Sequence, residues 1–282
     1  MKQICLLIMA FSSLVCDAQT DSSHAAGDAS TKTKATLGLD LTYSNNANYY
    51  GQVAEESLPY VAVQASYRLG FGLYFTGMAY KLLQGDNQVV SASNLGAGVA
   101  FPLSKKVSLD FSYNHTFYPS YSPLLQASNP DNATALLTYE TWVSSTLNVD
   151  YAFGKTSDYF VTAGIGKTVN LTTGEKGILS VKPSFDIVGG TQHFYQIYLI
   201  DKRLEDSLLG LLLPPPDNSP ASVTSMATEF NLISYNFKAP ISYNRANYVI
   251  EAAYQLSILS NKAQSGPGKV NSFISLSFYY QF

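Results

Sequence analysis

The strongest constraint on the fold is a strict alternation of apolar and polar side chains, seen most clearly in the last twelve residues, "NSFISLSFYYQF". Ile274, Leu276, Phe278, Tyr280 and Phe282 share one face of an extended strand, because successive side chains of a strand point to opposite sides. The residues between them are two serines, a tyrosine and a glutamine. An unbroken apolar face with aromatic residues near its end is typical of a strand that faces lipid.

Similar short segments recur from Ala35 to the C-terminus. Most have the length of about 9–11 residues that a tilted strand needs to cross a bilayer. The expected number of strands is about twelve, an even number as in bacterial single-chain barrels. They are ATLGLDLTY, YVAVQASYR, GLYFTGMAYKLL, SNLGAGVAF, VSLDFSYN, STLNVDYAF, YFVTAGIGKT, LSVKPSFDIV, TQHFYQIYLI, FNLISYNFKAPI, NYVIEAAYQLSIL and the final stretch.

The connections between these segments alternate between short and long. The expected short turns lie around "LGF", "PLSKK", "GKTSD", the glycine pair Gly189 and Gly190, and "YNRAN". The three longest connections are expected at residues 44–58, 119–137 and 201–228. The even count requires residues 191–200 to be a strand, with the two glycines as a tight hairpin turn before it.

Composition narrows the class of protein. The chain has 282 residues, of which 46% are hydrophobic and only 13% are charged, with 21 Tyr and 15 Phe. A formal net charge of -3 argues against nucleic acid as a partner. No segment after the N-terminus reaches about 18 uninterrupted apolar residues, so any crossing of a membrane must use strands.

The N-terminus resembles an export signal. One early Lys, an apolar run from Ile4 to Val15 and small residues near Ala18 predict a signal peptide over residues 1–18. Residues 19–33 are small and polar and predict a flexible periplasmic leader, followed by the barrel over residues 34–282. Both cysteines, Cys5 and Cys16, lie in the signal, so the mature chain would contain none. An alternative is that Cys16 is the lipidated first residue.

These features together resemble bacterial outer-membrane β-barrel proteins. The resemblance implies an all-β fold, a closed antiparallel transmembrane barrel with short periplasmic turns and longer extracellular loops. It also implies the outer membrane of a Gram-negative bacterium as the location. The residues Phe278, Tyr280 and Phe282 of the last strand resemble the signal that the barrel-assembly machinery reads. A soluble β-sandwich or a lipocalin-like barrel is the alternative, and it leaves the aromatic terminal strand unexplained.

Few residues suggest covalent chemistry. "GIGKT" at residues 164–168 lacks the first glycine of a phosphate-binding loop, because that position is Val161. The histidines have no metal-ligand spacing. An outward pair of Ser93 and His115, expected to lie opposite each other, resembles part of an outer-membrane phospholipase site. However, we expect no acid or amide beside His115 to orient the imidazole, so an interfacial His is the preferred interpretation.

The inward face carries the more informative residues. Charged groups there avoid a cost of about 2–4 kcal/mol for a Lys or Arg facing the bilayer midplane, so they must line water or pair inside the barrel. The predicted pore-lining residues are Asp40, Gln64, Arg68, Asn94, Asp110, Asn148, Asp150, Lys182, Asp186, Asn236, Lys238, Glu251 and Gln255, with Asn114 on the same face.

The loop after residue 201 is rich in leucine. Leu204, Leu208, Leu211 and Leu212 have helical spacing and precede three prolines, which predicts a short lid at the mouth or at the lipid interface.

The sequence therefore favours a narrow channel for small solutes in contact with outer-membrane lipid, with no cofactor, no metal and no enzymatic activity. A structural or surface-interaction barrel with a closed lumen is the main alternative, and a lipid-acting enzyme built on Ser93 and His115 is a further one.

Overall fold

The computed structural model describes residues 35–84, 88–119, 122–174, 177–206, 229–266 and 268–282. Most of these residues form one antiparallel sheet. The predicted signal and leader, residues 1–33, lie outside the described ranges. Within these ranges no helix is both long enough and apolar enough to span a membrane.

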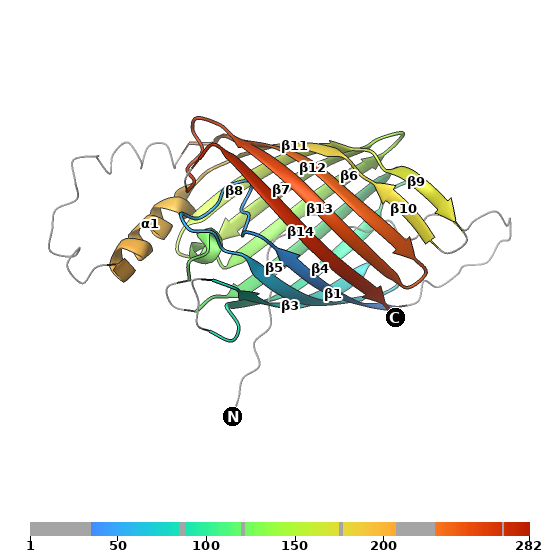
Figure 1. The fold of residues 1–282 in the computed structure, drawn as a ribbon, viewed down its shortest axis with the longest axis horizontal. Coiled ribbons are helices and arrows are strands. Elements are labelled where there is room, and N and C mark those ends of the chain that lie inside the picture. Colours follow the sequence, from blue (N-terminus) through green and yellow to red (C-terminus); the bar gives the residue numbers. More distant parts are fainter. Residues whose placement is uncertain (1–34, 85–87, 120–121, 175–176, 207–228, 267) are drawn as a thin grey trace, which may run out of the picture.

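The sheet closes on itself to form a barrel (Figure 1). Each strand of the wall pairs with its neighbours in chain order, β8 pairs with β11, and β1 pairs with β14 to complete the ring. The twelve strands of the wall are β1 (Thr36–Ser44), β2 (Tyr60–Arg68), β3 (Leu73–Leu82), β4 (Ala92–Pro102), β5 (Val107–Phe117), β6 (Asp131–Glu140), β7 (Ser144–Phe153), β8 (Ser157–Gly166), β11 (Ser184–Gly190), β12 (Asn231–Arg245), β13 (Tyr248–Leu259) and β14 (Val270–Gln281).

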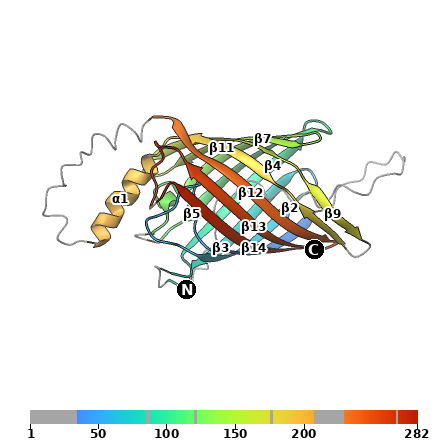
Figure 2. The same ribbon diagram turned by 45° about the horizontal axis from the view of Figure 1, so that its top comes forward.

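The remaining strands, β9 (Val169–Gly174) and β10 (Gly177–Val181), form a hairpin between β8 and β11. It extends the barrel at the end where the chain terminates, because β10 pairs with the second half of β12 (Figure 2). Gly38, near the start of β1, pairs with Gln281, at the end of β14, so the chain enters and leaves the barrel at the same end. This is the periplasmic side in a barrel with an even number of strands.

The opposite, extracellular end carries two short helices, η1 (Leu125–Ser128) and α1 (His193–Asp206) (Figure 1). The outer wall is apolar, and its large side chains are half exposed: Leu41 by 49%, Leu95 by 53% and Leu276 by 54%. In a transmembrane barrel lipid covers such a wall, and closure pairs every backbone group that lipid could not satisfy. The predicted fold class is confirmed.

The segment LSVKPSFDIV, predicted as one strand, is divided at Lys182 and Pro183 between β10 and β11. Two further predictions of individual elements were wrong. Residues 131–140 form strand β6, although most of them were predicted to be loop. Residues 191–200 were predicted to be a strand, but helix α1 begins at His193. Gly189 and Gly190 end β11 and form no hairpin turn. The two errors cancel in the number of strands.

The errors have physical causes. The outward face of β6 is built from Ala133 and Ala135 before any large side chain follows, so its apolar alternation is weak. In α1 the buried Phe194, Tyr195 and Tyr198 lie on one helical face. Phe194 and Tyr198 are four residues apart, so they would also share one face of a strand, and so short a segment does not distinguish the two periods. As a consequence, the "GKTSD" turn between β7 and β8 lies at the extracellular end and not at the periplasmic end.

We predict that Phe282 is needed for assembly. Its side chain is 65% exposed and packs edge-on against Tyr280, with ring centroids 4.7 Å apart, at the end of the outward row that includes Phe278. Deleting Phe282 should lower the amount of folded barrel in the outer membrane at least severalfold, as measured by the heat-dependent shift of folded barrels in gel electrophoresis. Normal accumulation of the shifted form would contradict the prediction.

Candidate functional site

The extracellular half of the barrel is filled by residues 45–59, the connection between β1 and β2, which we call the plug loop. On one side, the Gly51 carbonyl accepts a hydrogen bond from Asn271 of β14 at 2.8 Å, and the Tyr50 carbonyl accepts one from Ser234 of β12 at 2.7 Å. On the other side, the Tyr50 ring stacks on Phe160 of β8 with centroids 3.8 Å apart. The plug loop therefore crosses the lumen from wall to wall.

The tip of the plug loop is a tight turn. Tyr49 and Gln52 exchange backbone hydrogen bonds of 3.0 Å, and Tyr50 and Gly51 both have positive φ angles. A side chain at position 51 would lie 2.8 Å from the Ser234 hydroxyl and 2.9 Å from Asn236, so glycine is the residue that fits there.

The plug loop carries a cluster of aromatic rings. Tyr49 packs edge-on against Phe160 and Phe194, with centroid distances of 5.5 and 4.8 Å. Burial raises the pKa of Tyr49 and Tyr50, and nearby carboxylates raise it further, Asp158 most for Tyr49 and Asp150 most for Tyr50. Both phenols are therefore neutral at ordinary pH.

Glutamines tie the plug loop to two other extracellular segments. The Gln52 side chain, fully buried, donates to the Gln192 carboxamide oxygen at 2.8 Å and also to the Gln264 carbonyl. The same Gln192 oxygen accepts from the Gln264 backbone N–H at 2.7 Å. The start of α1, the plug loop and the connection between β13 and β14 are thereby joined in one hydrogen-bond network.

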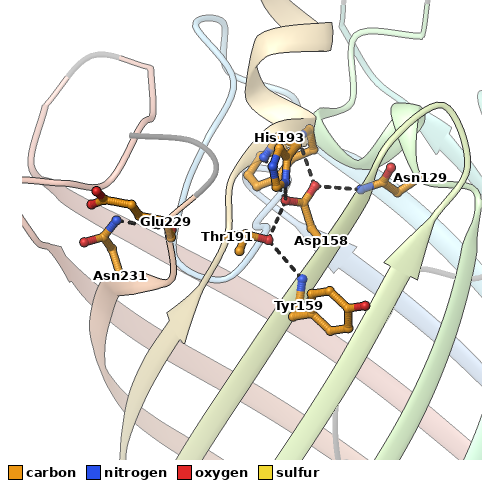
Figure 3. Close-up of polar contacts among 8 residues, drawn as sticks. Asn129, Asp158, Tyr159, Thr191, His193, Glu229 and Asn231 are labelled. Atoms are coloured by element: carbon orange, nitrogen blue, oxygen red, sulfur yellow. Dashed lines mark hydrogen bonds and ion pairs between the residues drawn. The ribbon is translucent and has the colours of Figure 1, made fainter. Parts of the chain in front are cut away.

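A second network centres on Asp158, at the start of β8 (Figure 3). Its carboxylate is fully buried and accepts five hydrogen bonds of 2.7 to 2.9 Å. Two of these bonds come from the backbone N–H groups of His193 and Phe194, so Asp158 caps the first turn of α1. The others come from Asn129, Thr191 and the His193 ring. Asp158 therefore holds α1 and the segment after η1 against the barrel rim.

The predicted pore-lining residues lie on the strand face opposite the exposed apolar wall, except Lys182, which lies between β10 and β11. Asn94, Asn148, Asp150, Asp186 and Asn236 are buried, and Arg68 is exposed. The remaining ones are half-buried: Asp40, Gln64, Asp110, Lys182, Lys238, Glu251 and Gln255.

The structure brings several of these residues together. Asp186 forms an ion pair with Lys238 at 2.8 Å, and Asn148 donates to Asp150 at 2.5 Å. Gln255 donates to Asn236 at 3.4 Å.

Other members of the set have partners that the sequence did not suggest. Tyr74 donates to Asp110 at 2.6 Å while the Arg68 guanidinium lies 4.8 Å from the Tyr74 ring centroid, and Ser242 donates to Glu251 at 2.6 Å. A polar, hydrogen-bonded interior inside an apolar wall is the arrangement of outer-membrane barrels. The chain is an outer-membrane β-barrel.

The leucine-rich lid falls mostly outside the described residues. Leu204 belongs to α1, while Leu208, Leu211 and Leu212 lie beyond it in a range that the structure does not describe. The lid therefore stays a prediction. Sequence reasoning missed the plug loop, Asp158 and the three glutamines. The asparagine- and tyrosine-rich "NNANYYGQV" within residues 45–53 was the available signal for the loop.

The outward pair of Ser93 and His115 differs from the expectation. His115 faces Leu95, and Ser93 faces Phe117, because the register of β4 and β5 is shifted by two residues from the predicted one. An acid does orient the imidazole: Asp131 on β6 lies 2.7 Å from the His115 Nδ1 atom. The expectation that no such acid exists was wrong, yet the predicted serine is not opposite the histidine. Among the described residues, no group of three His, Cys, Asp or Glu side chains is placed to hold a metal ion.

Comparison with known proteins adds the following. No protein-family model matches the chain, and no curated protein matches it in sequence. Similar solved structures include the KdgM porin, with a TM-score of 0.49, 10% identity and coverage of 87% of this chain and 99% of the porin. A bacterial polysaccharide outer membrane secretin has a TM-score of 0.48, 8% identity and coverage of 89% and 99%. LpxR from Salmonella typhimurium, an enzyme, has a TM-score of 0.43, 9% identity and coverage of 87% and 99%. Similarity this low assigns neither a solute nor a reaction to this chain.

We predict that Asp158 stabilises α1 and the plug. Replacing Asp158 by Ala removes a helix cap and leaves buried donors unpaired, which should cost about 2–4 kcal/mol locally. Hydrogen exchange at the amides of His193 and Phe194 should accelerate at least tenfold. Glu229→Ala is the control, since the Glu229 side chain forms an exposed ion pair with Lys262 at 3.4 Å and its removal should change exchange little. Equal exchange in both variants would show that Asp158 does not hold the helix.

Proposed function

We propose that this protein is a narrow outer-membrane channel for small solutes, closed at its extracellular mouth by the plug loop in the conformation described. The observation that carries the proposal is that a separate loop, and not the side chains of the wall, closes a polar lumen. Since a loop can move without unfolding the barrel, the closure can be reversible.

The number of strands supports this proposal. Barrels of eight strands have interiors that side chains can fill, and porins of sixteen or more strands hold an aqueous channel. The twelve strands here lie between these sizes. The plug loop and the residues that pack on it, such as Phe194 and Leu124, occupy the space that the wall leaves.

The charges support it as well. Arg68 is exposed, and the side chain of Lys238 keeps 35% of its surface exposed although it is paired with Asp186. Charged groups inside a barrel that reach solvent are the groups that act on ions at close quarters in a pore.

A structural barrel with a permanently closed lumen is the second candidate. It is favoured by the depth of the plug contacts, since Gln52 and Gln192 are both fully buried and hydrogen-bonded to each other. In that case the extracellular loops would carry the function. The two candidates differ in whether loosening the plug alone opens a path for ions.

We predict that Tyr50→Ala opens the channel. The substitution removes the ring that stacks on Phe160 and spans the lumen, so the plug loop should populate positions outside it. In planar bilayers the variant should show discrete conductance steps at least about threefold more often than the unaltered protein.

Tyr254→Ala is the matched control, because the Tyr254 ring is 45% exposed on the outer wall. It should conduct like the unaltered protein. If Tyr50→Ala inserts as a folded barrel and yet passes no ions, the channel proposal fails and the closed structural barrel is the better account.

A further inference from the structure

The extracellular half of the lumen contains a small cavity beneath the plug loop. It lies against the inner faces of β4 to β7 and is closed on the other side by Asn48 and Tyr49 of the plug loop. Its volume is about 30 Å³, which is room for about one water molecule. Movement of the plug loop would remove Asn48 and Tyr49 and open this cavity to the lumen.

The lining of this cavity is unusual in its chemistry. Carboxamides dominate it, namely Asn48, Asn94, Asn114, Gln126, Asn129 and Asn132. Within the described lining there is no carboxylate, ammonium, guanidinium or imidazole group. The ion pair of Asp186 and Lys238 lies on β11 and β12. Asp110 on β5 and Asp150 on β7 lie outside the lining of the cavity.

The two phenols of the lining are also uncharged. Burial raises the pKa of Tyr118 and of Tyr49, so neither ionises at ordinary pH. The site therefore offers hydrogen bonds without a net charge.

One group of the lining lacks a partner. Asn129 is 5% exposed, and its Nδ2 atom donates to Asp158 at 2.9 Å. Its Oδ1 atom has no hydrogen-bond partner within the described residues. A buried acceptor without a partner costs free energy, so a ligand or water that donates to it would bind favourably.

From this lining we infer that the channel conducts neutral, hydroxyl-rich solutes of the sugar class, which take the place of Asn48 and Tyr49 when the plug loop leaves the lumen. A hydroxyl group both donates and accepts, as does a carboxamide, so the two match without requiring an ion. A carboxylate or phosphate would have to lose its water here without meeting a cation, which is costly. The inference rests on the proposed channel function and narrows its solute.

The test compares two trisaccharides that differ in charge, maltotriose and trigalacturonate. Each is added to planar bilayers that contain the Tyr50→Ala barrel, and the block of the ion current is measured against concentration. Maltotriose should block at a concentration at least about tenfold lower than trigalacturonate. Calorimetric binding of both sugars to the purified full-length Tyr50→Ala barrel is measured in parallel.

Variants connect the effect to the cavity. Asn114→Leu keeps the number and branching of the side-chain heavy atoms and removes the hydrogen bonds, so half-block by maltotriose should need about tenfold more sugar. Asn170→Leu is the matched control on the exposed β9 hairpin and should change the value less than twofold.

The outcomes separate the two proposals. A barrel that conducts ions but is blocked equally or better by trigalacturonate, or is not blocked by maltotriose, overturns the sugar inference and leaves the channel. A barrel that never conducts overturns the channel proposal, and absence of maltotriose binding by calorimetry then overturns the inference as well. An unchanged block in Asn114→Leu places the sugar elsewhere and also overturns it.

Discussion

The pairing of β1 with β14 is the interaction on which the rest of this structure depends. In hydrocarbon no water is available to satisfy backbone N–H and C=O groups, so a sheet survives there only when its first and last strands pair. Here Leu39 of β1 pairs with Tyr280 and Leu41 with Phe278, so the aromatic terminal strand completes both the hydrogen-bond ladder and the lipid-facing surface. The alternation of side chains then follows along every strand, apolar toward lipid and polar toward the lumen.

Closure of the barrel also encloses a space that must be filled. A ring of twelve strands encloses more space than its own inward side chains fill. The chain answers this differently at the two ends. Toward the periplasm the inward groups are half-buried and paired, as with Asp110 and Tyr74. Toward the outside the plug loop brings in aromatic rings, and it forms hydrogen bonds with the wall and with Gln192.

The extracellular end is therefore a small folded core built on a membrane barrel. Leu58, Leu124, Phe160, Phe194 and Ile233 come from five different segments and are almost completely buried together. Asp158 lies at the edge of this core. Its carboxylate accepts hydrogen bonds from the first turn of α1, which it caps, and from Asn129. The proposed opening of the mouth requires this core to rearrange locally while the barrel stays closed.

The sequence by itself determined the class of fold, the outward and inward faces of most strands, and the polar character of the lumen. These are local properties, because one face of every strand contacts lipid, and each strand therefore alternates between apolar and polar side chains within its own sequence. The inward residues Asp150, Asp186 and Lys238 could be named from that alternation alone.

Only the tertiary structure decided which weakly alternating segments are strands and what fills the lumen. Residues 131–140 pair because β5 and β7 offer them open edges, and residues 193–206 are helical because Asp158, far away in the sequence, caps their first turn. The contact of Gln52 with Gln192 joins residues 140 positions apart, and no local pattern encodes it. The physical reason is that these contacts exist only after the ring has closed and brought its extracellular loops to one mouth.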